Sequence, residues 1–158
     1  MRAPTISCAS ASRPRSGSAR EPVCASAFLL FNGHRRHTLL DHLGFGVSDV
    51  ATSKAFFTAA LAPLGYIAVM EGGGGVGIGI GKPILWLAPA DGKPAPLHIA
   101  CHTDDRAVVD AFYQAALAAG GKDNGAPGLR PHYHPNYYAA FVIGPDGHNL
   151  EVVCHKAL

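Results

Sequence analysis

The distribution of apolar residues predicts an order of strands and helices that occurs twice in the chain. Apolar side chains alternate along residues 39–49, as in a strand, and Asp49 then opens an amphipathic helix that ends near Pro63 and Gly65. Glycine and proline separate the three short strand candidates that follow, at 66–71, 75–81 and 84–90. A new strand at 97–104 starts the order again.

The second half of the chain repeats this order. Asp104 or Asp105 opens a helix over residues 106–121, and two apolar runs at 137–144 and 150–155 flank a Pro-Asp-Gly turn, which predicts a hairpin. A shift of 56 residues aligns His42–Gly65 with His98–Gly121 without a gap, and ten of the 24 aligned pairs are identical. One βαβββ unit is therefore used twice.

This repeat predicts the fold class and the domain boundaries. We expect an α+β fold in which two βαβββ modules, at about 39–90 and 96–156, form a curled mixed sheet with one concave face. Both modules belong to one domain spanning 39–156. Residues 1–38 are rich in Arg, Ser, Ala and Pro and have no period, so they predict a disordered arm, an organelle transit peptide or an over-extended gene model.

Composition narrows the class of protein. With 48% hydrophobic and 15% charged residues, the chain is typical of a soluble globular protein, and no apolar run approaches the roughly 20 residues of a membrane span. Residues 1–40 carry six Arg and one Glu, whereas 41–158 carry seven basic and ten acidic side chains. The folded part is thus mildly acidic, which argues against a nucleic-acid partner.

The cysteines indicate a reducing compartment. Four are scattered through the chain without CxxC spacing, at positions 8, 24, 101 and 154, so neither a disulfide framework nor a zinc ribbon is expected. We expect a cytoplasmic protein, or import into an organelle if residues 1–38 are a transit peptide.

Strand alternation places three polar side chains on one face. Glu151 interrupts an apolar run, and a carboxylate there costs free energy unless a positive group meets it. Because side chains alternate along a strand, His42, His98 and Glu151 all point away from the helices. If the first and last strands of a module are adjacent, His98 and Glu151 can reach one metal ion at about 2.0 to 2.2 Å.

These features resemble a known family. The paired modules, opened by "DHLGFGVSD" and "LHIACH" and closed by "GPDGHNLEVV", resemble the vicinal oxygen chelate superfamily over about residues 39–156. It includes glyoxalase I, extradiol dioxygenases, fosfomycin-resistance proteins and bleomycin-binding proteins. The resemblance implies one divalent metal ion (Fe, Mn, Zn or Ni), with His42, His98 and Glu151 as its ligands.

The sequence departs from glyoxalase I at the fourth ligand. That enzyme usually supplies a carboxylate from the last strand of its first module, where this chain has Leu85 or Trp86, neither of which binds metal. Glu71 is a weaker candidate from another strand. Two histidines and one glutamate leave coordination positions open, as in the facial triad of non-haem iron enzymes.

The remaining candidates are expected around the concave face that carries the three metal-ligand candidates. Trp86 and Arg130 are candidates for substrate binding, the latter through paired hydrogen bonds to an anionic group. His134 and Tyr138 are candidate catalytic residues, with His132 and Tyr137 as alternatives from the same Pro-rich stretch. His102 and His155 lie about 13 Å further along their strands, too far to join the same ion.

Two classes of function follow. The first is a metal-dependent lyase, isomerase, dioxygenase or thiol transferase that acts on a small substrate chelating the ion through neighbouring oxygens. The alternative is a metal-free small-molecule-binding dimer of the bleomycin-resistance type. The resemblance also implies a homodimer, in which His42 of one subunit can join His98 and Glu151 of the other.

Overall fold

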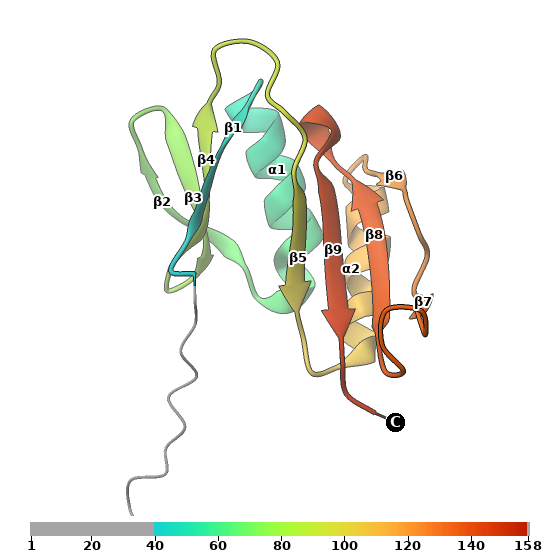
Figure 1. The fold of residues 1–158 in the computed structure, drawn as a ribbon. Helices are drawn as coiled ribbons and strands as arrows, with labels where there is room; N and C mark the ends of the chain where they lie inside the picture. Colours follow the sequence, from blue (N-terminus) through green and yellow to red (C-terminus); the bar gives the residue numbers. More distant parts are fainter. Residues whose placement is uncertain (1–39, 158) are drawn as a thin grey trace, which may run out of the picture. The chain divides into compact units, whose positions relative to one another are not determined.

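The computed structural model describes residues 40–157, which form two halves with similar element order (Figure 1). The first half contains β1 (Leu43–Val47), α1 (Val50–Leu61), the short 3-10 helix η1 (Ala62–Leu64), β2 (Ile67–Gly72), β3 (Gly75–Ile80) and β4 (Lys82–Pro89). The second contains β5 (His98–His102), α2 (Arg106–Ala118), β6 (Lys122–Asp123), β7 (Gly128–Leu129), β8 (Tyr138–Ile143), the 3-10 helix η2 (Pro145–Gly147) and β9 (Asn149–Cys154). The predicted elements are confirmed, and the predicted arm at 1–38 lies outside the described residues.

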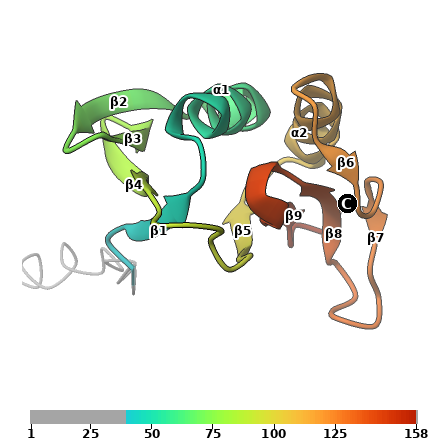
Figure 2. The ribbon, with the colours of Figure 1, turned by 90° about the horizontal axis from the view of Figure 1, so that it is seen from above.

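Each half builds its own mixed sheet. The strand orders are β1-β4-β3-β2 and β5-β9-β8-β6, with β7 also paired to β8. As expected, the first and last strands of each half are parallel neighbours, β1 with β4 and β5 with β9. The single curled sheet that was expected is two separate sheets. β1 pairs with β4 and β5 pairs with β9, so each stands at the end of its own sheet. Figure 2 shows both helices on the same side of these sheets.

Aspartate side chains define where both helices begin. The carboxylate of Asp49 accepts a hydrogen bond from the Thr52 amide at 2.6 Å, and that of Asp105 accepts one from the Ala107 amide at 2.9 Å. Asp105, and not Asp104, is thus the cap of α2. Asp49 and Asp105 are equivalent under the 56-residue shift, so the repeat includes the residues that cap the helices.

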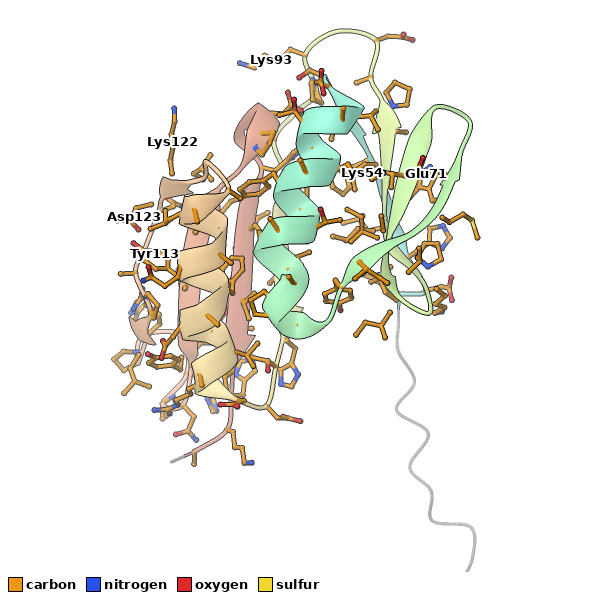
Figure 3. The ribbon with its side chains drawn as sticks, turned by 180° about the vertical axis from the view of Figure 1, so that it is seen from behind. Lys54, Glu71, Lys93, Tyr113, Lys122 and Asp123 are labelled. Carbon is orange, nitrogen blue, oxygen red and sulfur yellow. The ribbon has the colours of Figure 1, made fainter. Side chains whose placement is uncertain are left out.

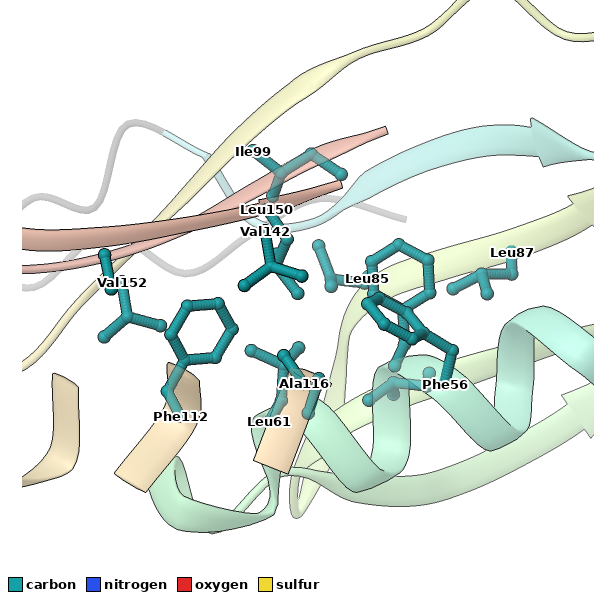
Figure 4. Close-up of a cluster of buried hydrophobic side chains, with 14 of the residues drawn as sticks. Phe56, Leu61, Leu85, Leu87, Ile99, Phe112, Ala116, Val142, Leu150 and Val152 are labelled. Atoms are coloured by element: carbon teal, nitrogen blue, oxygen red, sulfur yellow. The ribbon is translucent and has the colours of Figure 1, made fainter. Parts of the chain in front are cut away.

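The core forms between the helices and the faces of the sheets that they cover. It includes Phe45 and Val47 from β1, each with less than a tenth of its surface exposed. Leu150 and Val152 from β9 and Phe112 from α2 are equally buried (Figure 4). These are the apolar positions that strand alternation predicts. The opposite faces of the sheets are therefore left for polar side chains.

The Pro-Asp-Gly turn joins the two halves. Asp146 adopts a left-handed conformation, with φ of 60°, and its carboxylate accepts hydrogen bonds from the backbone amide and the hydroxyl of Ser48. His148 is buried, its Nδ1 accepts a hydrogen bond from the Leu97 amide at 3.0 Å, and its ring lies edge-on to Phe45. The turn thus fixes β9 beside the end of β1.

Two short strands lie in the Pro- and Gly-rich stretch for which no element was expected. β6 and β7 both pair antiparallel with β8, through Lys122 opposite Ile143 and Gly128 opposite Ala139. They bring the segment that contains Arg130 beside the second sheet. Among the described residues, no helix has the length and apolar character needed to cross a membrane.

Candidate functional site

Two neighbouring strands of the second sheet, β5 and β9, present the candidate metal ligands His98 and Glu151. Ala100 on β5 and Phe141 on β8 are both register partners of Glu151 on β9, and His98 lies two residues before Ala100 on the same face. Glu151 is only 1% exposed, whereas the His98 side chain is 55% exposed. The face that looks away from the helices therefore has a buried carboxylate beside an accessible imidazole.

The carboxylate of Glu151 is bonded at both oxygens. His98 Nε2 lies 2.8 Å from Oε2, and the hydroxyl of Tyr137 donates a hydrogen bond to Oε1 at 2.5 Å. Burial, followed by this hydrogen bond and the negative charge of Glu151, raises the pKa of Tyr137 to about 12. Tyr137 therefore remains a hydroxyl donor at neutral pH and fixes the orientation of the carboxylate.

The spacing of His98 and Glu151 fits two ligands of one metal ion. Nitrogen and oxygen ligands lie about 2.0 to 2.2 Å from a divalent ion, so two ligands at right angles are about 3 Å apart. The distance of 2.8 Å between His98 Nε2 and Glu151 Oε2 is close to that value. Within residues 40–157, however, no group of three His, Cys, Asp or Glu side chains has the geometry to hold an ion.

His42 directly precedes β1 of the first sheet, in a different environment. Its Nδ1 is 3.0 Å from Oδ1 of Asp41, whose other oxygen is 2.5 Å from the ammonium of Lys82. Hydrogen bonds from Lys82 and His42 lower the pKa of the Asp41 carboxyl to about 2. A donor bond from Nδ1 to Asp41 leaves the Nε2 atom of His42 as the ring nitrogen that faces an ion or a ligand.

Strand pairing identifies the residue equivalent to Glu151. Gly44 pairs with Trp86 on β4 in the way that Ala100 pairs with Glu151 on β9, and Gly44 and Ala100 are equivalent under the 56-residue shift. The position of the missing fourth ligand is therefore that of Trp86 and not of the buried Leu85. Trp86, with His42, lines a hollow of about 400 Å³ on this sheet.

Arg130 lies at the edge of the second sheet. Its guanidinium donates a hydrogen bond to the Ala126 carbonyl at 2.7 Å and lies 5.6 Å from the ring centre of Phe141. The rings of Phe141 and His98 are 6.2 Å apart, so Phe141 neighbours both the arginine and the metal-ligand candidate. Substrate binding by Arg130 stays a prediction.

Aromatic side chains surround Tyr137. Its ring makes edge contacts with Tyr133 at 5.1 Å and with His155 at 5.0 Å. His155 also contacts His134 and stacks on His102 at 6.0 Å. His134 is therefore close to Tyr137, although none of these histidines joins a three-ligand group with Glu151 among the described residues.

The structure does not bring Tyr138 to this face. Its hydroxyl donates to Asp110 on α2 at 2.8 Å, and Arg106 lies 4.9 Å from its ring centre, so Tyr138 faces the helix. The residue that reaches Glu151 is Tyr137. The alternation of side chains along β8 could have predicted this difference. Tyr138 has the same parity as Ala140 and Val142, which are buried on the helix side.

Other candidates are engaged elsewhere. Glu71 on β2 is ion-paired with Lys54 on α1 (Figure 3), and the ring of His132 contacts Tyr133 at 4.2 Å. A larger hollow, of about 830 Å³, lies along α1 beside Gly120 and the turn that contains Asp146. None of the predicted site residues lines it.

Comparison with known proteins agrees with this fold. Residues 39–152 match the family model of the Glyoxalase/Bleomycin resistance protein/Dioxygenase superfamily, and the chain belongs to this superfamily. No curated protein matches the sequence.

Solved structures share the fold at low identity. One is a glyoxalase/bleomycin resistance protein from Albidiferax ferrireducens T118, with 24% identity, coverage of 74% of this chain and 99% of that one, and a TM-score of 0.66. Another is a glyoxalase/bleomycin resistance protein/dioxygenase family enzyme from Burkholderia phytofirmans PsJN, with 16% identity, coverage of 73% and 97%, and a TM-score of 0.59. An integron cassette protein of Vibrio cholerae has 22% identity, coverage of 74% and 94%, and a TM-score of 0.56.

Proposed function

We propose that the protein is a metal-dependent enzyme that acts on a small substrate with two neighbouring oxygen atoms. One divalent ion (Fe, Mn, Zn or Ni) is held by His98 and Glu151 of one chain and by His42 of a second chain. The observation that carries this proposal is the nearly complete burial of Glu151 with His98 Nε2 only 2.8 Å from its Oε2. A buried carboxylate beside an imidazole is costly for stability, and buried titratable groups with a specific charged partner are enriched at functional sites.

The location of His42 supports the proposal of a homodimer. Within the described residues, His42 lies next to β1 of the first sheet, and no third ligand accompanies His98 and Glu151. A two-fold dimer that faces the first sheet of each chain with the second sheet of the other supplies the third ligand twice. Asp41 then acts as the outer carboxylate that orients the His42 ring.

The residues around the pair have distinct roles in this proposal. A bound ion supplies Lewis-acid stabilisation of negative charge that develops on a substrate oxygen. Tyr137 keeps Oε1 of Glu151 occupied, so that Oε2 alone is offered to the ion. Arg130 binds an anionic group of the substrate, and His134 is the candidate acid or base beside Tyr137.

Elemental analysis of purified protein tests the metal site. We expect the wild type to hold about one equivalent of metal per chain after reconstitution, and His42→Ala, His98→Ala and Glu151→Gln each to lose most of it. His132→Ala is the matched control, because this histidine contacts Tyr133 in the exposed turn, and it should retain the metal. A wild type that takes up none of the four ions would contradict the proposal.

A mixture of two inactive variants tests whether the site is shared between chains. His42→Ala and Glu151→Gln are unfolded together and refolded at equal amounts. In a two-fold dimer, half of the molecules are mixed and each of these has one intact site of two, so about a quarter of the metal capacity returns. If neither metal nor activity returns although mixed dimers form, the proposed sharing of the site between chains is wrong.

A second candidate function is a metal-free small-molecule-binding dimer. It is favoured by the fact that Glu151 already has partners for both oxygens, His98 and Tyr137. Saturable ligand binding in a wild type that cannot be loaded with metal would select this function.

A further inference from the structure

A hollow of about 400 Å³ lies on the face of the first sheet that is turned away from α1. Trp86, Pro83 and Met70 form its apolar lining, and Gly44 lies beside Trp86 on the neighbouring strand. Pockets that bind small molecules are mostly apolar with a few polar groups at one end. This hollow has that composition.

Glycines on β3 hold the indole of Trp86 against the sheet. A Cβ atom at Gly77 would lie 2.9 Å from Cε3 of Trp86, and one at Gly75 would lie 3.1 Å from its Nε1. The ring therefore lies against the β3 backbone, where larger residues would displace it. In contrast, a Cβ atom at Gly44 would meet nothing within 4 Å, so there is open space beside the ring.

Three polar side chains, Asp41, His42 and Lys82, also line the hollow, and Asp41 is hydrogen-bonded to both of the others. An ammonium group has three donors, and Asp41 uses one of those of Lys82. Lys82 therefore has further donors for an anionic oxygen of a ligand.

We propose that this hollow binds a planar aromatic ring bearing a carboxylate or phenolate oxygen. The ring stacks on Trp86 in the space that Gly44 leaves open, and the anionic oxygen bonds to Lys82. Binding itself requires no metal. The identification of such a compound as the substrate rests on the proposed function, because His42 lines the same hollow and is a proposed metal ligand.

Fluorescence of the full-length protein tests the proposal directly, because Trp86 is the only tryptophan in the chain. The probe is benzoate, added in the presence of a chelator. The comparison compounds are cyclohexanecarboxylate, which has the charge without the aromatic ring, and benzamide, which has the ring without the charge. Saturable quenching by benzoate is expected, with each comparison compound binding roughly threefold to tenfold more weakly.

Substitutions at Trp86 and Lys82 separate the stacking contact from the ionic contact. Ligand-observed NMR measures the affinity of each variant. Trp86→Phe retains an aromatic ring and should keep benzoate affinity within about threefold, whereas Trp86→Leu should weaken it roughly tenfold. Lys82→Met should weaken benzoate but not benzamide. Lys122→Met is the matched control on the second half of the chain (Figure 3) and should change neither. Circular dichroism verifies that each variant is folded.

Two results would overturn the inference. The first is the absence of saturable quenching at tens of millimolar benzoate, and the second is equal affinity for benzoate and cyclohexanecarboxylate. Benzoate binding by a protein that takes up no metal supports this inference and removes only the proposed metal chemistry.

Discussion

Tyr137 and Glu151 depend on each other at the level of single residues. Glu151 is almost fully buried, and its Oε1 receives the Tyr137 hydroxyl, while burial raises the pKa of that hydroxyl to about 12. Removing one partner of a buried hydrogen bond costs more free energy than the bond itself contributes. The other partner is then left buried, with no hydrogen bond to water or to the protein. Tyr137 is therefore a positioning residue for the candidate metal ligand.

Replacement of Tyr137 by phenylalanine tests this role. We expect Tyr137→Phe to lower the free energy of unfolding by about 1 to 3 kcal/mol, measured by urea denaturation, since Oε1 of Glu151 loses its donor. Metal affinity should fall roughly tenfold or more, as for other outer hydrogen bonds of metal ligands. Tyr133→Phe is the control, because Tyr133 is 62% exposed and contacts Tyr137 only through its ring. Equal effects of the two substitutions would contradict the role.

The sequence predicts those site residues whose position depends on strand alternation alone. His98 and Glu151 share a face because the pleat has a period of two, and their parallel strands are adjacent as expected. Tyr137 was only one of several candidates, because its reach to Glu151 depends on how the segment after β7 folds back onto β8. The location of His42 depends on how two sheets are arranged, which alternation within a strand does not determine.

At the level of helices and strands, aligned residues of the two halves have the same role only where their surroundings are equivalent. Asp49 and Asp105 cap their helices in the same way. Gly65 and Gly121 are aligned and identical, yet they differ: Gly65 ends η1 with φ of 81°, whereas a Cβ at Gly121 would lie 2.4 Å from the Val142 side chain. Identity within the repeat thus predicts an element more reliably than it predicts a residue's role.

The caps give a prediction at this scale. Asp105→Ala should lower the free energy of unfolding by about 1 kcal/mol, because the Ala107 amide loses its acceptor. Asp104→Ala is the matched control on the preceding residue and should have an effect within about 0.5 kcal/mol. Urea denaturation of both variants provides the comparison. A larger loss for Asp104→Ala would mean that the helix begins one residue earlier than described.

At the level of the whole described region, His148 joins the two halves. Its ring is 1% exposed, its Nδ1 accepts the Leu97 amide hydrogen, and it packs against Phe45 and Phe57. Burial lowers the pKa of this imidazole, against the opposing effects of Asp146 and the Gly46 backbone, so the folded state holds it neutral. A proton on Nδ1 would remove the bond to Leu97.

Stability should consequently depend on pH through His148. In the unfolded chain the imidazole takes up a proton near pH 6.5, whereas the folded state does so only at lower pH. The unfolded state therefore binds more protons in this window, and the free energy of unfolding should fall as the pH drops below about 6.5. Urea denaturation between pH 8 and 5 measures the slope. His148→Gln should be less stable throughout but should show a shallower slope, and an unchanged slope would contradict this assignment.

Glu151 also has a consequence for how such a chain can diverge. Its burial beside His98 and Tyr137 costs stability, since hydrophobic side chains of similar volume commonly stabilise a fold when they replace a buried polar group and all of its partners together. Under the proposed function, a lineage that no longer needs metal chemistry would gain stability by joint replacement of these three residues, while the hollow beside Trp86 is kept.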